Sequence, residues 1–240
     1  MHVALRAEGI TVQFGGVIAV NDVSFSLPAQ SILGLIGPNG AGKTTLFNAA
    51  TGFVPLGAGK VFLGDQDITH VPPYARTRLG MGRTFQIERP FEELTVLENV
   101  LIPAFLHHSR RKDAEALAMQ ALATVGMDDR ARQPASDLNL ARLRRLELAK
   151  ALAVKPTVLF LDEIMAGLNP PALSEMIELL KGLTAKGISI LMVEHIMEAI
   201  IRLSDHVLVL ANGSLIAEGT PQEVINDARV IEAYLGADES

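Results

Sequence analysis

The segment "LIGPNGAGKTTL" at positions 35–46 constrains the fold more than any other part of the sequence. It begins with apolar residues typical of a buried strand, and then places three glycines within six positions before a lysine and two threonines. Glycines inside a strand forfeit packing and cost backbone entropy. Residues 37–44 match the pattern G-x-x-x-x-G-K-[ST] and are followed by the helical segment "TTLFNAATG". This context predicts a loop whose bare main-chain amides wrap a phosphate group at the N-terminus of a helix.

The residues of this loop have separate expected roles toward a nucleoside triphosphate. Lys43 is expected to reach the β- and γ-phosphates, and the Thr44 hydroxyl is expected to bind Mg²⁺. Thr45 is expected to donate near the α-phosphate. The cradle itself is formed by Asn39, Gly40, Ala41 and Gly42. The alternative is an ordinary glycine-rich turn between a strand and a helix.

The segment "VLFLDE" at 158–163 indicates that the bound nucleotide is hydrolysed. Four apolar residues predict a buried strand, and two carboxylates follow at its C-terminal end, where open α/β sheets bind their ligands. We expect Asp162 to hold Mg²⁺ through water and Glu163 to orient and deprotonate the attacking water. A strand that ends at a solvated acidic turn is the alternative interpretation.

The rest of the chain predicts an α/β core interrupted by a helical insertion. Apolar residues recur at helical spacing over 114–125, and "TVLFLDE" and "ISILMVE" read as strands of a parallel sheet. Asn169 is expected to cap a helix that begins with two prolines. A hairpin is expected around Asn212-Gly213, and a capping box at Thr220 and Glu223.

Composition excludes several other classes of protein. The net charge of −6 argues against a non-specific nucleic-acid binder, and the absence of cysteine excludes disulfides and thiolate chemistry. The N-terminal segment has no signal-peptide pattern, and no window approaches the roughly 18 apolar residues of a membrane-spanning helix. We therefore expect a soluble chain located in the cytoplasm.

These motifs, in this order, resemble the ATP-binding subunits of ABC transporters over essentially the whole chain. The phosphate loop is followed by "RTFQ", a signature-like segment at 138–147, the acidic strand end, "AGLN" at 166–169 and "VEH". The resemblance implies a P-loop NTPase (RecA-like) α/β core with an N-terminal antiparallel β subdomain and an inserted α-helical subdomain. It implies one domain over 1–240, with its nucleotide-binding core at 1–86 and 156–240 and its helical subdomain at 87–155.

The resemblance also implies roles for residues outside the two central motifs. Phe14 is similar to the family's aromatic residue that stacks on adenine; the alternative is an ordinary strand aromatic. Gln86 would sense Mg²⁺ and the attacking water, and would link the core to the helical subdomain. His195 would contact the γ-phosphate. Asn169 stands where the family typically has an Asp that makes contacts across a dimer interface.

The signature segment departs from the family pattern L-S-G-G-Q, because residues 138–142 read "LNLAR". In the family this helix N-terminus points at the γ-phosphate held by the partner subunit. Asn139 is still suited to cap the helix, whereas Ala141 brings a Cβ atom where glycine permits close approach. We expect weaker stabilisation across the dimer; the alternative is a purely structural helix. Arg144 and Arg145 are expected to be exposed on it.

Within the family, several stretches resemble the ATPase subunits of importers for branched-chain and other hydrophobic amino acids. Such a system implies permease subunits, a second ATPase subunit in a homodimer or heterodimer, a periplasmic substrate-binding protein acting indirectly, and a location on the inner face of the cell membrane. The family docks its permease near Pro90, Phe91 and Leu94. Open alternatives are urea or amide import, lipopolysaccharide export, a soluble ABC ATPase without permeases, and a regulatory nucleotide-binding module.

Overall fold

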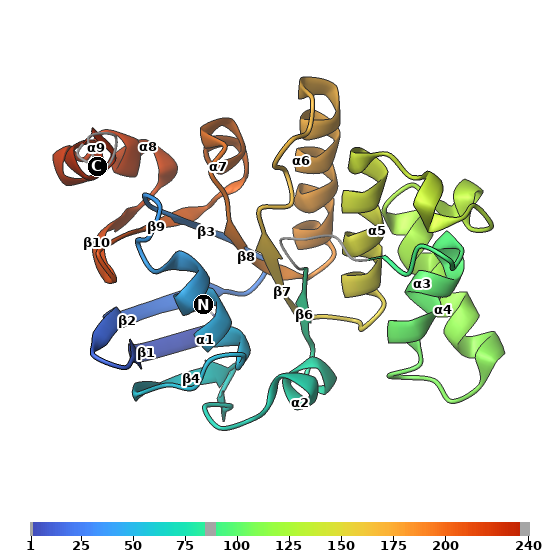
Figure 1. The fold of residues 1–240 in the computed structure, drawn as a ribbon, viewed down its shortest axis with the longest axis horizontal. Helices are drawn as coiled ribbons and strands as arrows, with labels where there is room; N and C mark the ends of the chain where they lie inside the picture. Colours follow the sequence, from blue (N-terminus) through green and yellow to red (C-terminus); the bar gives the residue numbers. More distant parts are fainter. Residues whose placement is uncertain (1, 85–89, 236–240) are drawn as a thin grey trace.

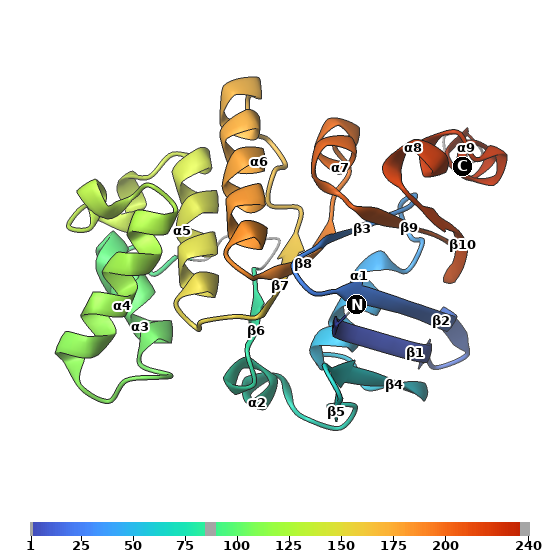
Figure 2. The same ribbon diagram turned by 180° about the vertical axis from the view of Figure 1, so that it is seen from behind.

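The computed structural model describes residues 2–84 and 90–235, which Figures 1 and 2 show from opposite sides. Within these residues the strands form an antiparallel sheet in the order β2-β1-β4-β5 and a mixed sheet in the order β10-β9-β3-β8-β7-β6. The first sheet consists of β1 (Val3–Phe14), β2 (Val17–Pro28), β4 (Ala58–Leu63) and β5 (Gln66–Asp67). The second consists of β3 (Ile32–Ile36), β6 (Met81–Arg83), β7 (Val158–Asp162), β8 (Ser189–Val193), β9 (His206–Ala211) and β10 (Ser214–Gly219).

Helices surround the mixed sheet and extend from one end of it (Figure 1). They are α1 (Lys43–Thr51), α2 (Pro73–Arg78), α3 (Val96–Ala104), α4 (Arg111–Thr124), α5 (Leu140–Leu152), α6 (Pro170–Ala185), α7 (Met197–Leu203), α8 (Pro221–Ile225) and α9 (Ala228–Leu235), with 3₁₀ turns at Asp128–Arg130 and Ala135–Asp137. No helix within 2–84 and 90–235 is long and apolar enough to cross a membrane.

The central strands of the mixed sheet are buried on both faces. Every residue of β3, β7 and β8 is buried, and these strands run parallel to one another. Their side chains alternate between two cores: Val158 and Phe160 face the antiparallel sheet, whereas Leu159 and Leu161 face the helices. The continuous apolar runs of the sequence therefore predicted parallel strands correctly.

The helix that follows the phosphate loop lies between the two sheets (Figure 1). Phe47 of α1 is fully buried, and its ring meets that of Phe160 edge to face at 5.3 Å between centroids. This packing fixes α1 against β7, the strand that carries Asp162. The phosphate loop and the acidic strand end are thus held by one core.

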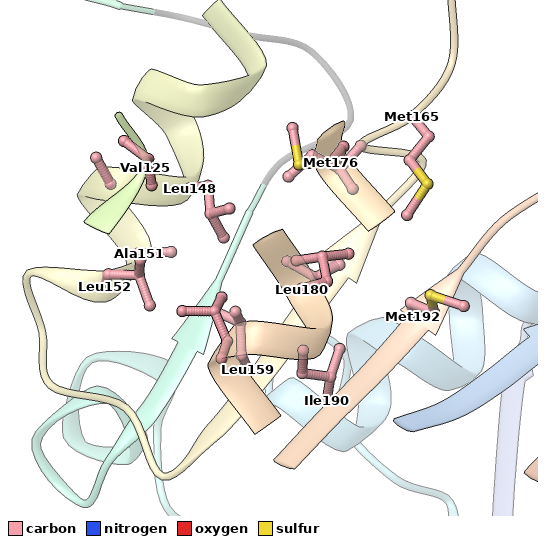
Figure 3. Packing of buried hydrophobic residues seen from close by; sticks show 14 of the residues in the cluster. Val125, Leu148, Ala151, Leu152, Leu159, Met165, Met176, Leu180, Ile190 and Met192 are labelled. Atoms are coloured by element: carbon pink, nitrogen blue, oxygen red, sulfur yellow. The ribbon is translucent and has the colours of Figure 1, made fainter. Parts of the chain in front are cut away.

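On the opposite face, α6 covers the mixed sheet and α3, α4 and α5 pack together beyond it (Figure 2). Figure 3 shows Met176 and Leu180 of α6 over Leu159 and Ile190 of the sheet. Helix α4 buries the face expected from its periodicity, with Ala114, Leu117, Ala118, Ala121 and Leu122 inside. The three helices fall within 87–155, but the proposed division into two subdomains remains a prediction.

Other local predictions are confirmed. Asn169 caps α6 by accepting from the Ala172 amide at 3.0 Å. Strands β9 and β10 form the hairpin around Asn212-Gly213, and Thr220 and Glu223 form a capping box.

One prediction about the signature helix is wrong, and the segment that contains Gln86 is only partly described. Arg144 was expected to be exposed but is buried at 8% exposure, because it lies one turn before Leu148 on the inner face of α5. Arg145 is half-buried. The motif "RTFQ" is described only as far as Thr84, and Gln86 lies outside the described residues, so its expected role remains a prediction.

Candidate functional site

The loops that follow β3, β7 and β8 enclose a pocket of about 570 Å³. The phosphate loop contributes one wall of the pocket. Another wall contains Glu163, which follows β7, and His195, which follows β8. Its lining residues are Val17, Ile18, Ala19, Asn39, Gly40, Ala41, Gly42, Lys43, Thr44, Thr45, Glu163, His195, Asn212 and Gly213. All seven loop residues predicted to bind nucleotide therefore line the same pocket as Glu163 and His195.

The phosphate loop needs its glycines for two different contacts. A Cβ atom on Gly37 would lie 2.1 Å from the Leu210 carbonyl oxygen, and one on Gly42 would lie 2.5 Å from that of Ala19. Gly42 also has a φ of 98°, a conformation that residues with side chains rarely adopt. The loop is thus packed against the main chains of β2 and β9.

The N-terminus of α1 has no side-chain cap, unlike those of α3 and α8. Gly42 occupies the cap position without a side-chain hydrogen bond, and the first turn contains no acidic residue. By contrast, Thr95 and Thr220 cap their helices with complete capping boxes. The first amides of α1 therefore remain available to an anion in the pocket.

Lys43 places a buried positive charge at this helix start. Its side chain folds against the loop, where Nζ donates to the carbonyl oxygens of Gly37 at 2.7 Å and Pro38 at 2.9 Å. Burial lowers the pKa of Lys43, while the nearby carboxylates of Glu163 and Asp162 oppose that change. The two carboxylates therefore favour the charged ammonium that a phosphate would bind.

Glu163 and His195 meet in the wall of the pocket. His195 Nε2 lies 2.6 Å from Glu163 Oε1, with side chains that are 43% and 21% exposed. Glu163 has a φ of 50°, in the sparsely populated left-handed region. Its amide donates to the Val193 carbonyl oxygen at 2.9 Å. An unusual backbone conformation, held by a neighbouring strand, thus presents this carboxylate to the pocket.

Asp162 lies deeper than Glu163, at 3% exposure. Burial raises the pKa of Asp162, and the positive charge of Arg83 opposes the increase. Arg83 Nη2 lies 3.9 Å from Asp162 Oδ2, and Arg83 Nη1 donates to Thr51 Oγ1 at 2.9 Å. The same guanidinium lies 4.7 Å from the ring centroids of both Phe47 and Phe53. Arg83 is thus held rigidly beside the acid expected to serve Mg²⁺.

The donors at this site fit a magnesium ion bound together with phosphates. Mg²⁺ prefers oxygen ligands and is usually held by one or two carboxylates, substrate phosphates and water. Thr44 supplies a hydroxyl in the pocket and Asp162 supplies a carboxylate behind it. Among the described residues, no group of three or more acidic, histidine or cysteine side chains could hold a metal alone.

Three of the residues predicted from the family resemblance lie outside this pocket. Phe14 is 52% exposed at the end of β1, where it pairs with Val17 of the pocket wall. Asn139 caps α5 by accepting from the Arg142 amide at 3.1 Å, and Ala141 follows in the first turn. The adenine role of Phe14 and the cross-dimer roles of Asn139 and Ala141 remain predictions.

Sequence reasoning missed several lining residues. Val17 and Ile18 bring exposed apolar side chains to the pocket, and the β9–β10 turn reaches it through Asn212 and Gly213. The Gly213 amide donates to the Ala41 carbonyl oxygen at 3.0 Å, so this turn also braces the phosphate loop. The Asn-Gly pair signalled a hairpin, but nothing in its spacing indicated what the turn would touch.

Comparison with known protein families agrees with this geometry. A family model described as "ABC transporter" matches residues 20–166, and one described as "Branched-chain amino acid ATP-binding cassette transporter" matches residues 214–240. The chain is 40% identical to the high-affinity branched-chain amino acid transport ATP-binding protein LivG of Escherichia coli (strain K12), over 97% of both proteins. It is 38% identical to a probable LivG of Archaeoglobus fulgidus, over 98% of this chain and 96% of the relative.

Solved structures show the same relationship. The ADP conformation of an ATP-binding cassette of an ABC transporter has a TM-score of 0.90 and 31% identity, covering 98% of this chain and 100% of that one. A nucleotide-free cassette has a TM-score of 0.89 at the same identity, covering 97% and 98%. The chain therefore belongs to the ATP-binding subunits of ABC transporters, and the predicted P-loop ABC ATPase fold is confirmed.

Proposed function

We propose that this subunit hydrolyses ATP with Mg²⁺ and thereby drives uptake of branched-chain or other hydrophobic amino acids through membrane-spanning permeases. The observation that carries the hydrolytic part is the contact between Glu163 Oε1 and His195 Nε2 in the wall of the pocket that Lys43 lines. Glu163 lines the same pocket as the phosphate loop, where its carboxylate can accept a proton from a water that attacks the bound phosphate.

The mechanism starts with binding of the triphosphate. The uncapped amides of α1 and the Lys43 ammonium hold the phosphate oxygens and oppose their negative charge. Mg²⁺, when bound, neutralises charge on the β- and γ-phosphates; Thr44 and Asp162 would hold it, with Gln86 as a further expected ligand. Val17 and Ile18 offer apolar surface at the same pocket, beside the exposed ring of Phe14.

Hydrolysis then requires one proton transfer. A water oxygen attacks the γ-phosphorus, the bond between that phosphorus and the bridging oxygen breaks, and the electron pair leaves with ADP. The Glu163 carboxylate accepts the proton of the attacking water. His195 holds Glu163 through Nε2 and would contact the γ-phosphate from the end of β8.

We further propose that two such cassettes close on two ATP molecules, in a homodimer or with a second ATPase subunit. Each pocket would be completed by the partner's α5 N-terminus, which carries Asn139 and Ala141. ATP favours the closed dimer over the open one by as much as it binds the closed dimer more tightly. Hydrolysis removes ATP and therefore this preference for the closed dimer. Movement would reach the permeases near Pro90, Phe91 and Leu94; Phe91 is 54% exposed.

The transported substrate is proposed from the relatives. LivG and BraF relatives at 36–40% identity are named for branched-chain amino acid transport, and the C-terminal 214–240 matches a model with the same description. The substrate would be delivered by a periplasmic binding protein, with this subunit on the inner face of the cell membrane.

Uptake of labelled leucine tests the proposal. Cells that express the chain with the permeases and any second ATPase subunit that co-purify from native membranes, together with the periplasmic binding protein of the same system, should accumulate leucine. A Glu163→Gln variant of this set should not. Co-purified permeases with no leucine uptake would reject the substrate and leave urea, amides or lipopolysaccharide as candidates. Purification without any permease would favour a soluble ABC ATPase.

A further inference from the structure

A buried carboxylate next to the pocket has no part in the mechanism described above. Glu194 follows the last residue of β8 and precedes His195, and it is only 1% exposed. Its Oε1 accepts from the Met165 amide at 3.0 Å. Burial raises the pKa of Glu194 to about 7, while main-chain amides of Met165 and His195 and the charge of Arg144 oppose the increase. A buried acid of this kind needs a reason to be retained.

The partner of Glu194 belongs to the turn that carries Glu163. Met165 lies two residues after Glu163, and the Ala166 amide closes the turn by donating to the Glu163 carbonyl oxygen at 3.2 Å. The Met165 side chain is fully buried, in the same hydrophobic cluster as Met176 and Leu180 of α6 (Figure 3). The turn is therefore anchored by its side chain in the core and by its main chain on Glu194.

Three contacts join the residues that follow β7 to the end of β8 and the residues after it. The Glu163 amide donates to the Val193 carbonyl oxygen at 2.9 Å, and the Met165 amide donates to the Glu194 carboxylate at 3.0 Å. In the third, Glu163 Oε1 meets His195 Nε2 at 2.6 Å. Of the two bonds from main-chain amides, the Glu194 bond is the one whose acceptor is a side chain.

The signature helix α5 reaches the same turn. Buried Arg144 donates from Nη2 to the Ala166 carbonyl oxygen at 3.3 Å. Gly167 has a φ of 77°, and a Cβ atom there would lie 2.9 Å from Leu140 Cδ2. The turn after Glu163 is thus enclosed by Glu194 on one side and by α5 on the other.

We propose that Glu194 is a positioning residue that holds the Glu163 turn against His195 and the signature helix, so that Glu163 stays aligned for proton transfer. The inference rests on the proposed ATP hydrolysis, because it assigns a role within that reaction. Misalignment of a reacting group by about 1 Å costs on the order of 100-fold in rate. Loss of the Glu194 bond should therefore slow turnover without weakening nucleotide binding.

A merely structural role for Glu194 gives a different result. A buried acid that only stabilised the fold would lower the melting temperature when replaced, and turnover per folded molecule would stay the same. A positioning role changes turnover per folded molecule and leaves the affinity for MgATP unchanged, because the phosphate loop makes no contact with Glu194 among the hydrogen bonds that the described residues form.

Three variants separate these possibilities. Glu194→Leu removes the acceptor, whereas Glu194→Gln keeps an amide oxygen that accepts from Met165. Asp205→Leu is the matched control, since Asp205 Oδ2 also accepts from a main-chain amide, that of Ile32 at 2.8 Å, at the opposite end of β3 from the phosphate loop. Turnover is measured in the assembled transporter, MgATP affinity on the full chain by calorimetry, and exchange of the Met165 amide by hydrogen–deuterium exchange.

We expect Glu194→Leu to lower turnover by about 10- to 100-fold, with MgATP affinity within about threefold of wild type and faster Met165 exchange. Glu194→Gln should recover turnover to within about threefold, and Asp205→Leu should leave it unchanged. Wild-type turnover in Glu194→Leu would overturn the inference, as would equal losses in Glu194→Leu and Asp205→Leu. A wild-type complex that does not hydrolyse ATP would instead reject the proposed function, while Met165 exchange would still report on the bond.

Discussion

His195 Nε2 lies 2.6 Å from Glu163 Oε1, and the two residues reach this contact from the ends of neighbouring parallel strands. A carboxylate only accepts hydrogen bonds, so the imidazole donates from Nε2. Glu163 makes this contact with a φ of 50°, so its backbone does not continue the extended conformation of β7. The acid that hydrolysis requires is therefore held by its backbone and by a second side chain.

Replacement of Glu163 by glutamine should separate binding from hydrolysis. The amide keeps the size of the side chain but does not accept a proton, so turnover should fall by about 100- to 10,000-fold, the range for a general base. MgATP affinity should stay within about threefold. Phosphate release and calorimetry measure the two quantities. Glu178 carries an exposed carboxylate on α6, so Glu178→Gln should change neither turnover nor MgATP affinity. Unaltered turnover in Glu163→Gln would exclude Glu163 as the base.

Removal of the cation beside Asp162 should weaken both the fold and the magnesium site. Arg83→Met leaves a buried carboxylate without its counter-charge, so the free energy of unfolding should fall by about 3 kcal/mol. The Mg²⁺ concentration that half-saturates ATP binding should rise, because without Arg83 the pKa of Asp162 increases further and the neutral carboxyl is a poor Mg²⁺ ligand. Denaturant unfolding and calorimetry at varied Mg²⁺ measure these effects. Exposed Arg132→Met serves as control, and wild-type stability together with wild-type Mg²⁺ dependence in Arg83→Met would refute this role.

The protonation of Glu194 should make stability depend on pH. Burial raises its pKa from the ordinary value of 4.5 to about 7 in the folded chain, so the folded state binds the extra proton between these values. The free energy of unfolding should therefore fall as pH rises through this window, and the stabilisation should be complete below pH 4.5. Glu194→Gln lacks this group, so its stability relative to wild type should increase from pH 5 to 7, by at most about 3 kcal/mol. Urea unfolding at several pH values measures the free energy of unfolding of both proteins. A difference between Glu194→Gln and wild type that stays constant with pH would contradict the prediction.

Two glycine-to-alanine changes should have opposite effects. At Gly42 the new Cβ atom would meet the Ala19 carbonyl oxygen at 2.5 Å in a backbone with φ of 98°, so both stability and MgATP affinity should fall. At Gly182, an exposed position inside α6, nothing lies within 4 Å of the new atom, and alanine should stabilise the protein by about 0.5–1 kcal/mol. Thermal unfolding compares them. A gain of stability in Gly42→Ala would show that the loop does not need this conformation.

The sequence predicted those features that depend on local pattern. Apolar runs identified β7 and β8, helical spacing identified α4, and the glycine pattern identified the phosphate loop, because each signal lies within one short segment. The carboxyl ends of parallel strands share one edge of a sheet, which is why Glu163 and His195 could be expected near each other.

Features that depend on distant partners could not be predicted in this way. Glu194 accepts from Met165, which lies 29 positions away, and no local spacing distinguishes this acid from a solvated one. The charge of Arg144 favours exposure, but the residue lies one turn before Leu148 on the buried face of α5, so the prediction that it is exposed was wrong. Val17 and Ile18 look like an ordinary exposed hairpin until the fold brings them to the pocket.

Calorimetric titration of the folded full-length chain with ATP, with and without Mg²⁺, tests the central claim most directly. The phosphate loop should bind ATP in a Mg²⁺-dependent manner, and Lys43→Met should weaken binding by about 10- to 100-fold, as expected for loss of a charge-assisted hydrogen bond. Exposed Lys60→Met should bind like wild type. Absence of Mg²⁺-dependent ATP binding by the folded wild-type chain would contradict the account.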